Sequence, residues 1–166
     1  TLLDPKPEVP FRSIIDFMER QIPFNAFLGV RVSALSEGRC ILHLPWREVF
    51  VGDPYRQVLH GGVTSTLMDT AGGAAAFTQI NLPHDRLSTV DIRIDYLRPG
   101  PPGDLYCEAV AERIGKHVAS TRMALWEFNP DEEDLSNKHP IATGRGVYSV
   151  KRAAAAEPES DEDSFA

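Results

Sequence analysis

The sequence predicts an α+β fold in which a curved antiparallel β-sheet wraps around one long central helix. Residues 59–77 form the longest apolar segment with helical spacing in the chain. From residue 87 to residue 150 the pattern changes to an alternation of period two, interrupted by turns. Strands joined by short turns pair antiparallel, and a long helix cannot leave its apolar stripe in water, so the sheet has to cover it.

Length and composition are those of a single globular domain. The chain has 166 residues, of which 42% are hydrophobic and 25% charged. No apolar run reaches the roughly 20 residues of a membrane helix, and the first ten residues carry no secretion signal, so we expect a cytoplasmic protein without a membrane contact. Cys40 and Cys107 lie far apart in separate alternating segments, and we expect two buried free thiols rather than a disulfide.

The negative charge is concentrated at the C-terminal end. Five acidic residues follow Arg152, and the net charge of −7 falls to −2 when they are set aside. A body this close to neutrality lacks the basic surface that nucleic-acid binding needs. The segment 153–166 is predicted to be a solvated, poorly ordered tail. We therefore divide the chain into an N-terminal extension with a short helix (1–23), the folded domain (24–152) and the tail.

The N-terminal third is expected to contain one short helix and one β-hairpin. Apolar residues interleaved with charged ones predict an amphipathic helix over 11–22, which ends before Pro23. Two alternating segments separated by a Ser-Glu-Gly turn predict strands over 29–35 and 39–44. Residues 45–59 show no regular pattern and are expected to form a long loop, a kind of segment that is often functional.

The long helix is expected to have two distinct faces. Its apolar stripe consists of Val63, Leu67, Thr70, Ala74 and Phe77. A second stripe is formed by small residues and one acid, namely Ser65, Asp69, Gly72, Gly73 and Ala76. Because small residues let another backbone or a ligand approach closely, Asp69 is expected to lie where something approaches the helix.

Four strands are expected in the C-terminal half, over 87–97, 105–113, 117–128 and 141–150. The segment 99–103 is rich in Pro and Gly and is predicted to be a turn, and the acidic segment 129–139 is predicted to be a surface loop. In the first of these strands, strict alternation puts Ser88, Val90, Ile92, Ile94 and Tyr96 on one face and Thr89 on the other.

Several short motifs occur in order along the chain. His60-Gly61-Gly62 comes nine residues before Asp69, Thr89-Val90-Asp91 opens a strand that ends in Tyr96-Leu97-Arg98-Pro99, and Gly115-Lys116 and Gly144-Arg145 come after them. This ordered set, spread over residues 24–150, resembles the hotdog-fold acyl-CoA thioesterases, in particular the phenylacetate-pathway and 4-hydroxybenzoyl-CoA branch. The resemblance implies the hotdog fold and the hydrolysis of an acyl-CoA thioester to the free acid and CoA, with no cofactor and no metal.

The residues themselves suit chemistry on a thioester carbonyl. A helix N-terminus presents unpaired N–H groups and a partial positive charge, which stabilise an oxyanion, and Gly61 and Gly62 have no side chains to block the approach. Asp69 lies about 10 Å further along the helix, too far to act on the same carbonyl within one chain. The resemblance implies that the Gly61 amide of one subunit works with Asp69 of another, in a homodimer or a dimer of dimers. Whether Asp69 attacks the thioester or deprotonates a water stays open.

The remaining site residues have two readings each. By resemblance Thr89 orients the water or the acid, but a strand threonine is equally ordinary. His60 either contacts the substrate and positions the loop, or simply starts the helix. The cations expected to bind the CoA phosphates, unless they are solvated surface charges, are first Arg113 and Lys116, then Arg98 and Arg145.

The loop before the helix departs from the family pattern. Members of this branch often have an Asn six positions before the histidine, where this chain has Pro54, with Asp53 and Gln57 as nearby polar residues. The departure keeps open a non-catalytic acyl-CoA-binding protein and, as a weaker alternative, a hotdog hydratase or dehydratase, which needs a His and a carboxylate in a different motif order. The residues that are candidates for an acyl pocket, or else for the core, are Met68, Phe77, Met123 and Trp126.

Overall fold

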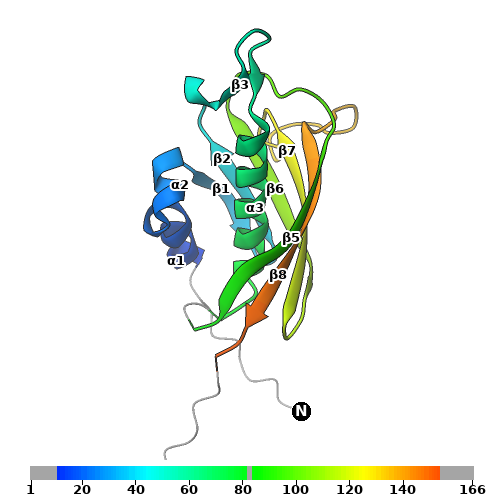
Figure 1. The fold of residues 1–166 in the computed structure, drawn as a ribbon. Helices are drawn as coiled ribbons and strands as arrows, with labels where there is room; N and C mark the ends of the chain where they lie inside the picture. Colours follow the sequence, from blue (N-terminus) through cyan, green and yellow to red (C-terminus); the bar gives the residue numbers. More distant parts are fainter. Residues whose placement is uncertain (1–10, 82–83, 154–166) are drawn as a thin grey trace, which may run out of the picture.

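One long helix, α3 (Gly61–Phe77), lies across the concave face of a curved sheet (Figure 1). The computed structural model describes residues 11–81 and 84–153. The first ten residues lie outside the described residues. So does the acidic tail beyond Ala153, for which we expected poor order. The predicted α+β class and the hotdog arrangement of sheet and helix are confirmed. Within the described ranges, no helix has the length and hydropathy needed to span a membrane.

The sheet has six strands that pair antiparallel throughout, in the order β1-β2-β6-β7-β8-β5. Their bounds are β1 (Arg31–Ser36), β2 (Arg39–Leu44), β5 (Arg86–Tyr96), β6 (Leu105–Ile114), β7 (Val118–Trp126) and β8 (Ala142–Lys151). Buried and less buried residues alternate along β7 and β8, because the helix covers only one face of the sheet. The long strand β5 forms one edge of the sheet.

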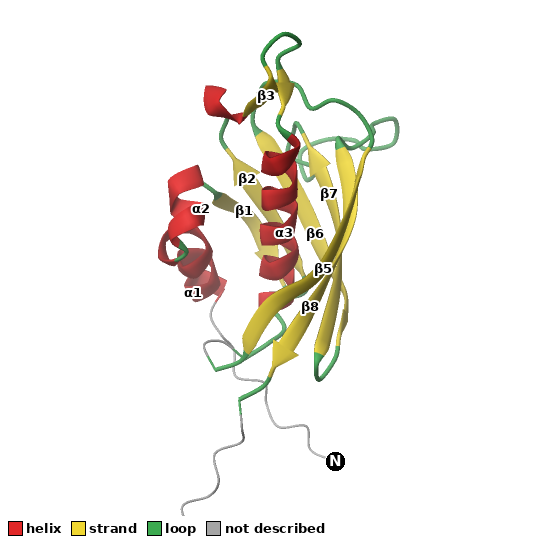
Figure 2. Cartoon of the chain, in the orientation of Figure 1, coloured by secondary structure: helices red, strands yellow, loops and turns green. Residues whose placement is uncertain are grey.

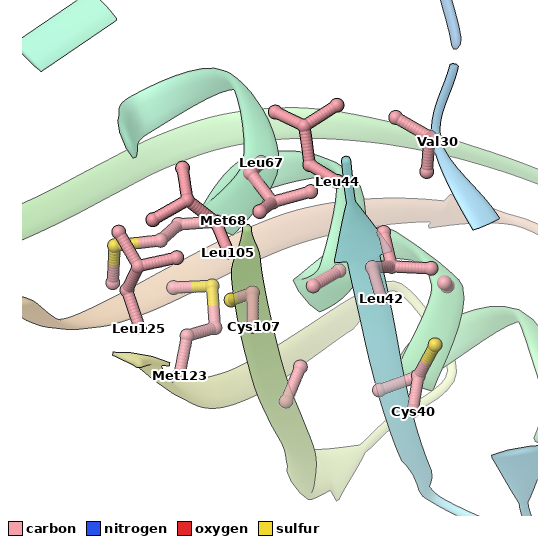
Figure 3. Close-up of a cluster of buried hydrophobic side chains, with 14 of the residues drawn as sticks. Val30, Cys40, Leu42, Leu44, Leu67, Met68, Leu105, Cys107, Met123 and Leu125 are labelled. Atoms are coloured by element: carbon pink, nitrogen blue, oxygen red, sulfur yellow. The ribbon is translucent and has the colours of Figure 1, made fainter. Parts of the chain in front are cut away.

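The main core lies between α3 and the concave face of the sheet (Figure 3). Its side chains include Leu67 and Met68 of α3, Leu42 of β2, Leu105 of β6 and Leu125 of β7. Cys40 and Cys107 belong to the same cluster and are free thiols, as expected. Burial raises the pKa of Cys40 to about 12, so this thiol stays protonated.

The N-terminal helical segment is longer and more broken than predicted. It consists of α1 (Phe11–Asp16), a π-helical turn η1 (Phe17–Gln21) and α2 (Pro23–Leu28). The first helical stretch ends before Pro23 as predicted, but the second helix that begins at this residue was not predicted. Ile22 is extended, and proline takes the first position of the new helix, where its missing N–H is not needed. Ile14 and Met18 reach the main core, and Figure 2 shows α1 and α2 beside α3, on the side of β1.

Residues 45–59, predicted as an irregular loop, contain short regular elements. These are a 3₁₀ turn, η2 (Glu48–Phe50), and a hairpin of β3 (Val51–Asp53) and β4 (Val58–Leu59). Strands of two or three residues are too short to show an alternating pattern, which is why the sequence did not reveal them. The hairpin stands over the N-terminus of α3 (Figure 1).

Strand β5 contains a β-bulge that the sequence did not predict. Its pairing passes from Thr89 opposite Tyr148 to Asp91 opposite Val147 and leaves Val90 as the extra residue. A bulge of one residue reverses the side-chain alternation beyond it, so the single even-numbered face predicted for this strand is wrong. Thr89 faces α3, whereas the side chain of Val90 is 67% exposed.

Part of the small-residue stripe on α3 faces the sheet rather than an open site. Gly72 and Ala76 are buried, and a Cβ on Gly72 would lie 2.2 Å from the hydroxyl oxygen of Tyr148. Asp69 and Gly73 are half-buried. What approaches this stripe at Gly72 is therefore a set of side chains from the chain's own sheet, those of Tyr148, Thr121 and Met123.

Candidate active site

The N-terminus of α3 is capped by the side chain of His60. His60 has an extended backbone, and its Nδ1 accepts a hydrogen bond from the Gly62 N–H at 2.8 Å. Because Nδ1 is the acceptor, the imidazole is neutral in this arrangement and carries its proton on Nε2. A Cβ on Gly62 would lie 2.9 Å from Nδ1, so glycine at this position is what allows the ring to fold back onto the helix.

The cap leaves one amide of the first turn unused. The N–H groups of Val63 and Thr64 donate to the carbonyl oxygen of His60, and that of Gly62 donates to the imidazole. Among the described residues, the Gly61 N–H has no acceptor. An unpaired amide at the positive end of a 17-residue helix is a donor suited to an oxyanion.

Contacts from η2, β3 and β5 fix this turn in place. The His60 N–H donates to the carbonyl oxygen of Phe50 at 2.8 Å, and a Cβ on Gly52 would lie 2.6 Å from the Cα of His60, so the hairpin lies directly on the start of the helix. From β5, the hydroxyl of Tyr96 donates to the carbonyl oxygen of Gly61 at 3.2 Å. The turn that carries the Gly61 amide is thus held by one main-chain hydrogen bond, at His60, and by one side-chain hydrogen bond, from Tyr96.

Asp69 lies in the middle of α3, beside β5. The Thr89 hydroxyl donates to Oδ1 of Asp69 at 2.9 Å, and this contact exists because the bulge at Val90 comes after Thr89 and leaves it facing the helix. Below the same turn, the Tyr148 hydroxyl donates to the main-chain carbonyl oxygen of Asp69 at 3.2 Å. The structure therefore brings the predicted residues Asp69 and Thr89 together.

The Gly61 amide and the Asp69 carboxylate are not brought together within one chain. They are eight residues apart on a straight helix, so their Cα atoms are separated by about 12 Å along its axis. Tyr96 contacts Gly61 and Thr89 contacts Asp69, so β5 runs antiparallel to α3. A single thioester carbonyl cannot touch both groups of the same chain.

The four predicted phosphate-binding cations do not converge. Arg113 and Lys116 are exposed around the turn between β6 and β7, which Figure 1 places at the end of the sheet opposite the N-terminus of α3. The guanidinium of Arg98 pairs with Glu127 and donates to a carbonyl oxygen of the 129–139 loop. Arg145 lies on strand β8 with its side chain 72% exposed, 3.7 Å from a carboxylate oxygen of Glu112.

Pro54 occupies the tip of the hairpin, and the polar residues beside it are used within the turn. Asp53 accepts hydrogen bonds from the main-chain N–H groups of Tyr55 and Arg56 and from the Arg56 side chain. The Arg56 guanidinium lowers the pKa of Asp53. Gln57 donates its side-chain amide to the carbonyl oxygen of Pro54 at 2.9 Å. Both polar residues beside Pro54 therefore make their hydrogen bonds within the turn itself.

The candidate pocket residues belong mostly to the core. Met68, Met123 and Trp126 are buried, and Phe77 packs edge-on against Phe17 with ring centroids 5.7 Å apart. Across residues 11–81 and 84–153, no three His, Cys, Asp or Glu side chains are grouped as metal ligands would be.

Two tyrosines at the site were not identified as site residues from the sequence. Tyr96 was expected only as an ordinary strand residue within a motif, and Tyr148 had no predicted role. Each contacts a main-chain carbonyl oxygen of α3, at Gly61 and at Asp69. The only available signal was the position of Tyr148 in the last strand, and it becomes informative once the register places it opposite Thr89.

Comparison with known proteins by sequence finds thioesterases and esterases. The sequence profile of the family described as Thioesterase superfamily matches residues 56–133. A Halobacterium salinarum protein with a provisional esterase name is 33% identical over 129 residues, which cover 76% of this chain and 83% of the relative. The Escherichia coli K12 protein YigI, named a medium/long-chain acyl-CoA thioesterase, is 28% identical over 141 residues, which cover 78% of this chain and 86% of YigI.

Solved structures agree with the sequence comparison. A protein described as belonging to the thioesterase superfamily matches with a TM-score of 0.72 at 28% identity. The match covers 84% of this chain and 97% of the chain of that protein. A thioesterase-family protein from Silicibacter pomeroyi matches with a TM-score of 0.73, covering 87% of this chain and all of its own. Its identity of 23% supports the fold alone. These likenesses cover between 76% and 87% of this chain and assign no role to any single residue.

Proposed function

Because this chain belongs to the thioesterase superfamily, we propose that it hydrolyses an acyl-CoA thioester to the free acid and CoA, at a site that two subunits share. The choice of acyl-CoA is supported by the YigI relatives, which are named for that substrate. The observation that carries the shared site is the separation of the Gly61 amide from the Asp69 carboxylate on one helix.

The arrangement of α3 and β5 supports a particular dimer. β5 is one of the two edge strands of the sheet, and an edge strand carries unpaired main-chain groups that can pair with a second copy. Tyr96 is level with Gly61, and Thr89 is level with Asp69. A two-fold axis passing near Ser65 on α3 and near the middle of β5 would exchange the two ends, so that the Gly61 amide of each subunit faces the Asp69 carboxylate of the other.

Each residue then has a definite task in the hydrolysis. The Gly61 N–H donates to the thioester carbonyl oxygen, and the donation strengthens as that oxygen gains negative charge. Asp69, oriented by Thr89, supplies a carboxylate that either adds to the carbonyl carbon or removes a proton from the attacking water. Both routes require the same placement of the acid, and neither requires a cofactor other than the CoA of the substrate.

We assign the phosphates of CoA to the exposed cations of the β6–β7 turn, Arg113 and Lys116, because Arg98 is already committed to Glu127. The dimer is sufficient for the catalytic groups, and a dimer of dimers, which the resemblance also implies, adds none of them.

The test compares two substitutions at Gly61, one that removes the main-chain N–H and one that keeps it. Gly61→Pro removes the N–H, and proline is tolerated here because Gly61 is the first residue of α3 and His60 before it is extended. Gly61→Ala keeps the N–H and places its Cβ at the tolerable distance of 3.4 Å from the Tyr96 ring. We expect Gly61→Pro to lower kcat on a panel of acyl-CoA substrates by roughly 100-fold, and Gly61→Ala to lower it far less.

Mixing two inactive variants tests the sharing. Gly61→Pro and Asp69→Ala are refolded together so that mixed dimers form, each with one site in which both residues are native. Random pairing should restore about a quarter of the wild-type activity. A mixture as inactive as its components would place both residues in one subunit's site and overturn the proposal. Tight CoA binding without thiol release from any substrate would favour the non-catalytic binding protein instead.

A further inference from the structure

We propose that Tyr148 is a positioning residue for Asp69, and that together with Thr89 it clamps Asp69 from the sheet. The inference rests on the proposed role of Asp69 in thioester hydrolysis and extends it to a residue that the family resemblance does not indicate. Thr89 holds the carboxylate of Asp69, and Tyr148 holds its main chain. The two hydroxyls come from directly opposed residues on neighbouring strands, β5 and β8.

The distances define the clamp. The Thr89 hydroxyl is 2.9 Å from Oδ1 of Asp69, and the Tyr148 hydroxyl is 3.2 Å from the Asp69 carbonyl oxygen. Tyr148 is 1% exposed, so water does not compete for its hydroxyl. Burial is the main reason that the pKa of Tyr148 is raised, and the negative charge of Asp69 adds to the rise. The hydroxyl therefore remains protonated and acts as a donor.

Two glycines make room for the Tyr148 side chain at this position. A Cβ on Gly72 of α3 would lie 2.2 Å from the Tyr148 hydroxyl oxygen, and a Cβ on Gly146 of β8 would lie 2.6 Å from the same atom. The ring is thus closely packed against the helix and against its own strand, and a side chain larger than glycine at either position would displace it. A hydroxyl held this firmly fixes the rotation and height of α3 at Asp69.

The clamp explains why the bulge in β5 falls where it does. Without the extra residue, strict alternation would put Thr89 and the inward-facing residues beyond Val90 on opposite faces of β5. With it, Thr89 faces α3 next to Tyr148, while Ile92 and Ile94 still pack on the core. One irregularity therefore satisfies both the packing of β5 and the orientation of the acid.

A purely structural tyrosine would also be buried and hydrogen-bonded, so the experiment has to separate the two roles. Tyr148→Phe removes only the hydroxyl. The matched control is Tyr106→Phe, because Tyr106 is a partly buried β6 tyrosine whose ring stacks on His43, away from Asp69. A second control, Ile41→Val, removes one buried methylene outside the core cluster around α3 and reproduces a modest loss of stability.

We expect Tyr148→Phe to lower kcat by roughly 5- to 20-fold while KM changes less than about twofold, because a misplaced reactive group loses rate rather than substrate binding. Both controls should keep kcat within about twofold of wild type. In an Asp69→Asn background, Tyr148→Phe should lower the residual kcat no further, because its effect acts through Asp69. An unchanged kcat, or an undiminished loss in that background, would overturn the proposal.

A readout that does not need activity keeps this inference separate from the proposed function. The NMR chemical shift of the Asp69 carboxyl carbon, measured at fixed pH, should change in Tyr148→Phe and stay constant in Tyr106→Phe and Ile41→Val. If no acyl-CoA is hydrolysed but the Asp69 signal still moves, the proposed function fails and the positioning role stands. If the enzyme is active and the signal does not move, the positioning role fails alone.

Discussion

His60 illustrates how much a single residue organises at the start of α3. Its N–H donates to Phe50 at the end of η2, its carbonyl oxygen accepts from Val63 and Thr64, and its imidazole accepts the Gly62 amide. The sequence left two readings open, a residue that contacts substrate and one that starts the helix. The structure places it as the helix cap, and a substrate contact through the remaining Nε2–H stays a prediction.

The cap can be tested by comparing two substitutions of His60. His60→Ala removes the acceptor for the Gly62 amide and should lower the free energy of unfolding by about 0.5–2 kcal/mol. His60→Asn supplies an oxygen at a preferred capping residue and should recover most of that loss. Urea unfolding monitored by circular dichroism measures both.

Activity then separates the cap from a substrate contact. If His60 acts only through the cap, His60→Asn should keep most of the wild-type kcat, whereas His60→Ala should not. A His60→Ala variant as stable as wild type would show that the imidazole does not stabilise the helix. Equal loss of kcat in both, with stability restored in one, would assign the ring to the substrate.

At the scale of the element, α3 carries two adjacent glycines with different surroundings. Gly72 faces the sheet, where Tyr148, Thr121 and Met123 all lie within 2.8 Å of the position a Cβ would take. Gly73 faces away from this contact, and a Cβ there would meet only the Tyr148 ring at 3.9 Å. The same residue type is therefore required at one position and merely tolerated at the next.

Alanine substitutions of these glycines should change stability in opposite directions. Gly73→Ala should raise the free energy of unfolding by about 0.5–1 kcal/mol, because glycine is a poor helix former and the new methyl group has room. Gly72→Ala should lower it by about 1–3 kcal/mol, because the methyl group collides with an enclosed tyrosine. Thermal or urea unfolding of both variants measures these changes. If the free energy of unfolding changes with the same sign in both, this packing of α3 is contradicted.

How far each element could be predicted depends on whether its pattern is local. β2 was predicted over 39–44 and is found at Arg39–Leu44, and α3 begins two residues later than predicted. The bulge at Val90 could not be predicted, because it depends on how β5 pairs with β8. The same rule holds for the site. Gly61 and Asp69 could be placed from helical spacing, whereas the contact of Tyr148 with Asp69 requires the register of the sheet.

At the scale of the whole molecule, Asp85 joins the start of β5 to the end of β8. Its side chain is 5% exposed. The carboxylate accepts from the Asn81 N–H at 2.9 Å, from the Arg152 guanidinium at 2.7 Å and from the Ala153 N–H at 3.0 Å. The same end of the sheet holds the C-terminal side of α3, so this one carboxylate fixes three segments that are distant in sequence.

The buried carboxylate of Asp85 predicts a defined acid dependence of stability. Burial alone would raise its pKa, but the two main-chain donors and Arg152 outweigh burial and lower it. Because the folded-state pKa lies below the unfolded value of about 3.9, Asp85 stabilises the fold fully above that pH. Its contribution is lost as the pH falls through the folded-state pKa. Asp85→Asn should therefore lower the free energy of unfolding by about 1.5–3 kcal/mol at pH 7, and this difference should shrink as the pH falls below the unfolded-state value.

A matched substitution isolates this effect from general acid destabilisation. Asp134 also has a lowered pKa, caused by its hydrogen bonds with Ser136, but it lies exposed in the loop before β8. Asp134→Asn should leave the free energy of unfolding close to wild type at both pH values, because solvent replaces what the carboxylate provides. The other carboxylates are common to wild type and variant, so they cancel in the difference. Urea unfolding of wild type, Asp85→Asn and Asp134→Asn at pH 7 and at low pH gives the difference in free energy of unfolding directly. If that difference does not vary with pH for Asp85→Asn, the charge of Asp85 does not hold these segments together.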